Sequence, residues 1–180
     1  MATATIGLTI EEFEQLPDVL ARNHELIDGE LVDVSGNTGS HILLRDAFVE
    51  LLRPYVRQHR LGLVLSEQEF DFDRNAHGPD VSFFGQSKAE LFDRQLRVQR
   101  FVPDLAIEIA SKNDRFDALF AKVLRYRRCG TKEVWVFSIL TRQVFLYSER
   151  PTVVLGESDN FQSPQIPGFS IPISDLFVMI

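Results

Sequence analysis

Cysteine is almost missing from this chain of 180 residues, which contains only Cys129. A single thiol excludes an internal disulfide framework and any multi-cysteine metal cluster, and it fits a reducing compartment. No apolar run approaches the roughly 20 residues that a membrane span needs. The N-terminus has neither the basic start nor the apolar stretch of a signal peptide. The composition therefore predicts one soluble, cytoplasmic domain over residues 1–180, with no role for a membrane.

Several common catalytic motifs are also missing. The chain has no phosphate-binding loop of the type Gly-x-x-x-x-Gly-Lys-Ser/Thr, no strand-linked Gly-x-Gly-x-x-Gly and no Gly-x-Ser-x-Gly elbow. Its four histidines lack the close paired spacing of a zinc site. Cys129 ends a predicted helix, where the helix dipole disfavours a thiolate. These absences argue against nucleotide-loop, serine-nucleophile, zinc and cysteine-nucleophile chemistry.

Positive charge is scarce overall but unevenly distributed. The net charge is −7, yet residues 88–132 hold eleven Lys/Arg against six Asp/Glu. A basic segment in an acidic protein can be a contact surface for a polyanion. The alternative is that Arg94, Arg97 and Arg100 only solvate one face of a helix. Composition alone favours this alternative.

The apolar pattern predicts an α+β fold with a mixed sheet. A capping box, Thr9 with Glu12, marks the start of the first helix. The expected elements are a helix over 10–16, a hairpin over 24–34 that turns at Asp28-Gly29, a helix over 41–59, strands over 61–72, 80–84 and 103–111, a helix ending at Cys129, a hairpin over 132–147 and a loop-rich tail that packs back on the core. The long helix should bury a stripe against the sheet, formed by Leu44, Phe48, Leu51 and Tyr55.

Two carboxylates occupy unusual places in these strands. Asp80 opens an apolar strand directly after Pro79, and Glu108 interrupts the most apolar strand of the chain. If the two strands pair antiparallel, the start of one lies beside the end of the other, and both carboxylates converge at one end of the sheet. Two close carboxylates repel unless a cation lies between them, and such oxygen ligands suit Mg²⁺ or Mn²⁺.

The following helix supplies a cation, Lys122, with Tyr126 four residues later. An ammonium group near a carboxylate-bound metal can orient a water and stabilise charge on a phosphate. Each residue also has a purely structural interpretation, in which Asp80 caps a turn, Glu108 faces solvent and Lys122 solvates a helix. The order of a strand Asp, a strand Glu and a helix Lys favours the catalytic interpretation.

An ordered set of segments resembles the Uma-type restriction endonucleases, a family long catalogued as a domain of unknown function within the PD-(D/E)XK nuclease superfamily. The similarity spans residues 9–175 and rests on Glu25 to Val32, His41, Pro79-Asp80-Val81, Pro103 to Ser111, Lys122-x-x-x-Tyr126 and Gly130-x-x-Glu133-Val134-Trp135-Val136. It implies a restriction-endonuclease-like core with a mixed central sheet flanked by helices, preceded by an N-terminal helix and hairpin. It also implies metal-dependent hydrolysis of phosphodiester bonds in nucleic acid, with DNA as the expected partner.

The same resemblance assigns roles by position. It implies that Asp80, Glu108 and the carbonyl of Ile109 hold Mg²⁺ or Mn²⁺, that Lys122 acts on the water and the phosphate, and that Glu30, His41 and Tyr126 are accessory residues. The superfamily pattern has a Lys two residues after the Glu, where this chain has Ala110. In the Uma-type pattern, the lysine of the next helix supplies that amine.

Three functions stay open at this point. The leading one is a Mg²⁺-dependent nuclease. The second is a binding module for nucleic acid or protein that keeps the nuclease fold without turnover, which Ala110 and the acidic total favour. The third is a small-molecule phosphohydrolase that uses the same carboxylates. The sequence also leaves open whether several copies of the chain associate.

Overall fold

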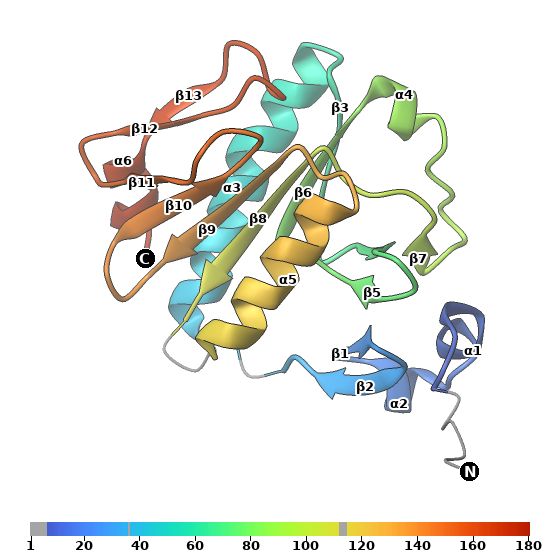
Figure 1. Ribbon diagram of the computed structural model, residues 1–180. Helices are drawn as coiled ribbons and strands as arrows, with labels where there is room; N and C mark the ends of the chain where they lie inside the picture. Colours follow the sequence, from blue (N-terminus) through green and yellow to red (C-terminus); the bar gives the residue numbers. More distant parts are fainter. Residues whose placement is uncertain (1–6, 36, 112–114) are drawn as a thin grey trace.

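A computed structural model describes residues 7–35, 37–111 and 115–180 (Figure 1). The helices are α1 (Ile10–Glu14), α2 (Asp18–Ala21), α3 (Gly39–Gln58), α4 (Gln86–Ala89), α5 (Phe116–Arg128) and α6 (Ile173–Val178). The strands are β1 (His24–Ile27), β2 (Glu30–Asp33), β3 (Gly62–Ser66), β4 (Glu69–Asp71), β5 (Ala76–His77), β6 (Val81–Gly85), β7 (Val98–Gln99), β8 (Leu105–Ala110), β9 (Glu133–Ser138), β10 (Gln143–Tyr147), β11 (Val153–Leu155), β12 (Asn160–Gln162) and β13 (Ser170–Pro172). The predicted α+β class is confirmed.

The N-terminal elements follow the local signals of the sequence. Thr9 and Glu12 form the predicted capping box at the start of α1. The β1–β2 hairpin turns at Asp28 and Gly29, whose φ angles of 50° and 84° are those of a turn with two left-handed central residues. Gly29 is also required for space, because a Cβ there would lie 2.7 Å from the Cα of Gly7.

The main sheet has six strands in the order β11-β10-β9-β8-β6-β3. Strands β6 and β8 pair antiparallel, with Val81 opposite Ile107, as the sequence argument for convergence of Asp80 and Glu108 requires. Strands β8 and β9 are parallel, and α5 is the crossover between them. The predicted mixed sheet is therefore confirmed.

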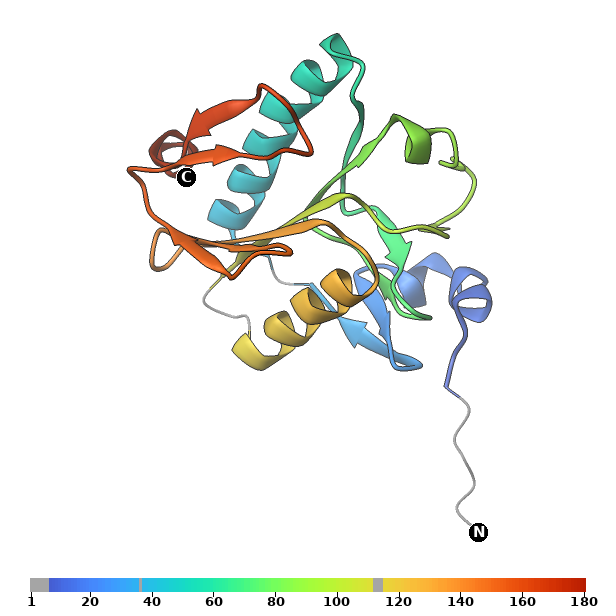
Figure 2. The same ribbon diagram turned by 45° about the horizontal axis from the view of Figure 1, so that its top comes forward.

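The predicted single strand over 61–72 is wrong. The chain turns at Glu67, which has a φ of 54°, and thereby divides the segment into β3 and β4. Strand β3 is an edge of the main sheet, whereas β4 belongs to a second sheet with the order β2-β1-β5-β4-β7. The N-terminal hairpin, β1 and β2, belongs to this second sheet and lies beside α5 (Figure 2).

Helices α3 and α5 cover opposite faces of the main sheet (Figure 1). On the α3 side, Leu44 and Phe48 are fully buried against the strands, while Leu51 and Tyr55 are partly buried at the margin of the same core. The predicted stripe therefore packs on the sheet. On the α5 side, Val123 and the ring of Tyr126 pack over the strands. The C-terminal helix α6 also packs back on the α3-side core, as the tail pattern predicts.

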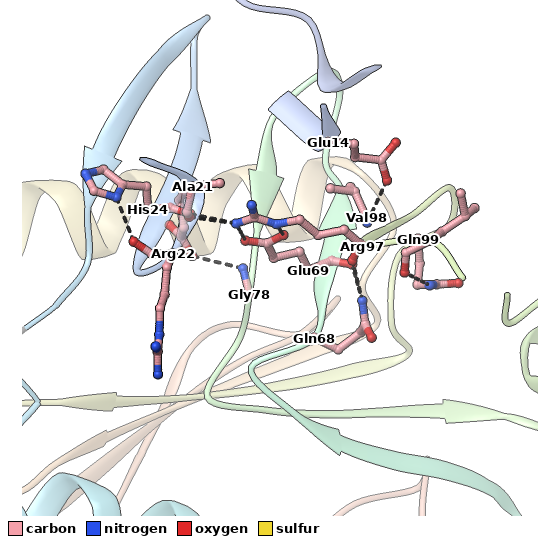
Figure 3. Close-up of polar contacts among 12 residues, drawn as sticks. Glu14, Ala21, Arg22, His24, Gln68, Glu69, Gly78, Arg97, Val98 and Gln99 are labelled. Carbon is pink, nitrogen blue, oxygen red and sulfur yellow. Dashed lines mark hydrogen bonds and ion pairs between the residues drawn. The ribbon is translucent and has the colours of Figure 1, made fainter. Parts of the chain in front are cut away.

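The arginines around β7 in the basic segment are ion-paired and do not lie on a helix. The guanidinium of Arg97 donates two hydrogen bonds to the carboxylate of Glu69, with N–O distances of 2.5 and 2.8 Å. It also donates one to the carbonyl of Ala21 (Figure 3). Arg100 pairs with Glu14 at 2.6 Å. These arginines flank the short strand β7, and Arg94 lies in a turn, so the expectation of a solvated helix face is wrong. Within the parts of the chain described above, no helix is long and apolar enough to cross a membrane.

Candidate active site

Asp80 lies directly before β6 and is held by two donors from different elements. One carboxylate oxygen lies 2.7 Å from Nε2 of His41, in the first turn of α3. The other accepts a hydrogen bond of 2.7 Å from the backbone N–H of Ile109 in β8. Because Ile109 follows Glu108, this second bond places the Asp80 carboxylate beside the strand that carries Glu108.

Glu108 points from β8 towards α5. Its face of the strand is shared with Ala106 and Ala110, whose small side chains leave room beside the carboxylate, as the alternation predicts. Tyr126 donates a hydrogen bond of 2.8 Å to Glu108, and the Nζ of Lys122 lies 3.2 and 3.3 Å from its two oxygens. Lys122 and Tyr126 can both reach the strand because residues four apart share a helix face.

Glu25 of β1 is the third carboxylate beside Lys122. Its Oε1 lies 3.0 Å from the ammonium nitrogen and also accepts a hydrogen bond of 2.9 Å from the backbone N–H of Gly78. Its Oε2 lies 2.8 Å from Nδ1 of His77 in β5. We call Glu25, Asp80, Glu108 and Lys122 the carboxylate cluster. Lys122 thus bridges a carboxylate of the main sheet and one of the second sheet.

The two carboxylates that touch Lys122 differ in their proton affinity. Burial pushes the pKa of Glu25 up, but Lys122 and the hydrogen bond from His77 push it further down, to about 2. Burial raises the pKa of Glu108 to about 8. The positive charge of Lys122 lowers this pKa, whereas the negative charges of Asp80 and Glu25 raise it further. Burial would lower the pKa of Lys122, but the surrounding carboxylates raise it. The ammonium is therefore charged throughout the physiological range.

Aromatic rings and a buried histidine pack around the cluster. Tyr126 is fully buried and stacks on Phe72 with ring centroids 4.2 Å apart. Burial lowers the pKa of His77 although Glu25 opposes the shift. A neutral His77 therefore donates from Nδ1 to Glu25, while its buried Nε2 has no hydrogen-bond partner in the described part of the chain. Arg125 of α5 also ties the hairpin turn to the helix, at 3.1 Å from Asp28.

The structure thus brings together most of the residues that the sequence singles out. Asp80, Glu108, Ile109, Lys122, Tyr126 and His41 are joined by the contacts above; their catalytic and metal-binding roles stay predictions. Glu30 is not part of this group, because its side chain is exposed at the start of β2, where the residue pairs with Ile27. The sequence argument missed Glu25 and His77. Alternation alone could not reveal them, because the pairing of β1 with β5 joins residues about 50 positions apart.

The atoms that this cluster offers to a metal are all oxygens. The carboxylates of Asp80 and Glu108 are donors of the kind that Mg²⁺ prefers, and the carbonyl of Ile109 stays a predicted third ligand. Among the residues that the structure describes, no three His, Cys, Asp or Glu side chains gather in a way that could hold a metal by themselves. The set therefore fits an ion that keeps several waters and is completed by a substrate phosphate.

Comparison with known proteins gives a family and a fold. The sequence model of the family "Uma2: Putative restriction endonuclease" matches residues 10–174. A crystal structure titled as a putative nuclease belonging to DUF820, from Anabaena variabilis, has 23% sequence identity and a TM-score of 0.84, covering 96% of this chain and 98% of that chain. No curated protein matches the chain. The restriction-endonuclease-like fold predicted from the sequence is confirmed.

Proposed function

Because the chain belongs to the Uma2 family of restriction endonucleases, we propose that it is a metal-dependent nuclease that hydrolyses phosphodiester bonds in DNA. The observation that supports this most directly is the convergence of Asp80, Glu108 and Lys122. The Lys122 ammonium lies 3.2 Å from the strand carboxylate of Glu108, and Asp80 stands directly before the neighbouring strand; this combination suits phosphodiester hydrolysis.

In this proposal the protein groups have distinct tasks. Asp80, Glu108 and the carbonyl of Ile109 would hold Mg²⁺ or Mn²⁺, which supplies an activated water and neutralises phosphate charge. His41 orients Asp80 by its contact with one carboxylate oxygen. Tyr126 orients Glu108 by donating to the other carboxylate. Lys122 stabilises the negative charge that grows on the phosphate in the transition state.

The position of Lys122 supports its assignment as the catalytic amine, a role that the superfamily pattern gives to the residue two positions after the Glu. That position is Ala110, at the end of β8, and it cannot supply an amine. Lys122 reaches Glu108 from α5 instead, so the amine comes from a helix that packs over the strand. Its charge is maintained by Glu25 as well as by Glu108. The chemistry of the lysine is therefore preserved although its place in the sequence has changed.

One observation favours a non-catalytic binding module as a second candidate. Asp80 and Glu108 are already engaged by the protein's own donors, namely His41, the N–H of Ile109, Lys122 and Tyr126. Burial also raises the pKa of Glu108 to about 8, so the metal-free carboxyl favours its neutral form. A chain that has lost turnover could keep such a cluster for stability alone.

Nicking of supercoiled plasmid and cleavage of single-stranded DNA, with Mg²⁺ or Mn²⁺, test the proposal. We expect the wild type to cleave, and Glu108→Gln and Asp80→Asn to lose cleavage while they keep their melting transitions. Glu30→Gln is the matched control, because it makes the same change at an exposed carboxylate of the β1–β2 hairpin. If all four proteins show the same trace of cleavage, the activity is a contaminant and the binding module is the better description.

A further inference from the structure

Half of the described arginines and lysines lie within 4 Å of a carboxylate, and three of the others neighbour one another at the end of α3. Arg45, Arg97, Arg100, Arg125, Arg128 and Arg142, together with the lysines Lys88, Lys122 and Lys132, all have ion pairs. Arg53, Arg57 and Arg60 have none with any carboxylate of the described residues. In a protein with a net charge of −7, three neighbouring cations without a carboxylate partner need an explanation.

These three arginines line one concavity. An open groove of about 750 Å³ runs between the end of α3 and the edge strand β3. Its lining includes Arg53, Arg57 and Arg60, together with residues 62–65 and Gln86. We call this concavity the arginine groove. None of its lining residues is a carboxylate. A second hollow, which also includes Arg53 and Arg57, contains Glu50.

Two structural explanations account for part of this arrangement. A cation near the C-terminus of a helix is stabilised by the helix dipole, which suits Arg57. Covering an edge strand prevents it from pairing with another chain, and Arg53 of α3 donates to the carbonyl of Val64 in the edge strand β3 at 3.3 Å. Neither explains why all three guanidinium groups surround one groove without a compensating acid. Like charges held together repel, and a bound anion removes that cost.

We propose that the arginine groove binds the phosphates of nucleic acid at a second place, remote from the carboxylate cluster. The inference rests on the proposed function, which makes nucleic acid the substrate. A guanidinium fork pairs with two phosphate oxygens at once, and three forks along a groove match a phosphate chain. Along α3, Arg57 is sixteen residues from His41, about 24 Å at 1.5 Å per residue. A polynucleotide that extends beyond the cleavage point therefore gains an anchor at the other end of the same helix.

The experiment measures binding without divalent metal, so that cleavage plays no part. The double variant Arg57→Gln/Arg60→Asn removes two groove charges; asparagine suits position 60 because its φ is 53°. The control Arg22→Gln/Arg150→Gln removes two charges from exposed arginines elsewhere. Fluorescence anisotropy gives the affinity for labelled 20-nucleotide single-stranded and 20-base-pair DNA in EDTA over a series of salt concentrations.

We expect the groove variant to bind at least about tenfold more weakly in low salt and to show a salt slope smaller by about two, whereas the control keeps the wild-type slope. Equal losses in both double variants would show that only net charge matters and would overturn the proposal. Displacement of the DNA by polyglutamate with the same dependence on Arg57 and Arg60 would also overturn it, since the occupant would then be an acidic chain. Because Glu108→Gln tests cleavage separately, either proposal can fail while the other stands.

Discussion

The two faces of the six-stranded sheet are formed by the same strands but bury different kinds of side chain. On the α3 face, Ile107 and Ile109 of β8 pack with Phe48 and with Trp135 of β9 in an apolar core. On the α5 face, the residue between those isoleucines is Glu108, and the helix above it contributes Lys122. One strand thus supplies packing on one side and charged groups on the other, because successive side chains point in opposite directions.

This difference has an energetic consequence. The α3 face gains stability from the removal of apolar surface from water and from close packing. The α5 face buries charges, and their desolvation cost is offset only while every partner is present. We therefore expect substitutions on the α3 face to change stability alone. Substitutions on the α5 face should change stability, its pH dependence and activity together.

The largest effect should come from the apolar face. Phe48 is 1% exposed and contacts the rings of Phe137 and Phe161 at 4.8 and 5.4 Å between centroids. Phe48→Ala should lower the free energy of unfolding by about 3–5 kcal/mol, because it leaves a cavity in the core. Urea denaturation measures this change. Leu43→Ala on the same helix is the control, since Leu43 is 54% exposed and should change stability by no more than about 0.5 kcal/mol.

A smaller but still large loss is expected at Lys122. Lys122→Ala leaves Glu25 and Glu108 buried without their shared cation, which should cost about 3 kcal/mol and abolish cleavage. Lys132→Ala is the matched control, because its ion pair with Asp104 involves a side chain that is 57% exposed and should contribute at most about 1 kcal/mol. Equal melting temperatures for the two variants would contradict the view that Lys122 holds the cluster together.

The pH dependence of unfolding should separate the two carboxylates of the cluster. The pKa of Glu25 falls from 4.5 to about 2 on folding, so its contribution is present above pH 4.5 and is lost as the pH falls towards 2. The pKa of Glu108 rises from 4.5 to about 8, so its contribution is present below pH 4.5 and is lost as the pH rises towards 8.

Urea denaturation of the wild type, Glu25→Gln and Glu108→Gln between about pH 2 and pH 8 measures both effects. Glu25→Gln should reduce the loss of unfolding free energy as the pH falls below 4.5. Glu108→Gln should become more stable than the wild type as the pH rises from about 5 to 8, because the pKa of Glu108 is 4.5 in the unfolded chain and about 8 in the folded one. A wild-type curve that Glu108→Gln leaves unchanged would show that the carboxyl is ionised like an exposed one.

The smallest effect should be that of Glu30. Its side chain is exposed on β2, so Glu30→Gln should change the free energy of unfolding by less than about 0.5 kcal/mol and leave cleavage unchanged. Thermal melting and plasmid nicking check both statements. A loss of cleavage in Glu30→Gln with normal melting would restore the accessory role that the family resemblance implies, through contact with substrate.

Local patterns were sufficient for much of the fold. The capping box of Thr9 and Glu12 and the Asp28-Gly29 turn act within a few residues and form as predicted. The alternation in β8 correctly put Glu108 on the side with Ala106 and Ala110. The break at Glu67 was not visible, because the residues around it continue an alternating pattern that suits one strand as well as two. Which sheet each half joins depends on distant partners.

The sequence by itself determined which residues could carry charge into the interior, because Asp80 directly precedes, and Glu108 lies within, a strand segment too apolar to remain in water. Only the tertiary structure decided that Lys122 meets Glu25 as well as Glu108. It also decided that Arg97 and Arg100 pair with Glu69 and Glu14, while the arginines of the arginine groove have no carboxylate partner among the described residues. The reason is physical. Side-chain direction follows from spacing of two to four residues, whereas the partner of a charge depends on how segments far apart in the chain are packed together.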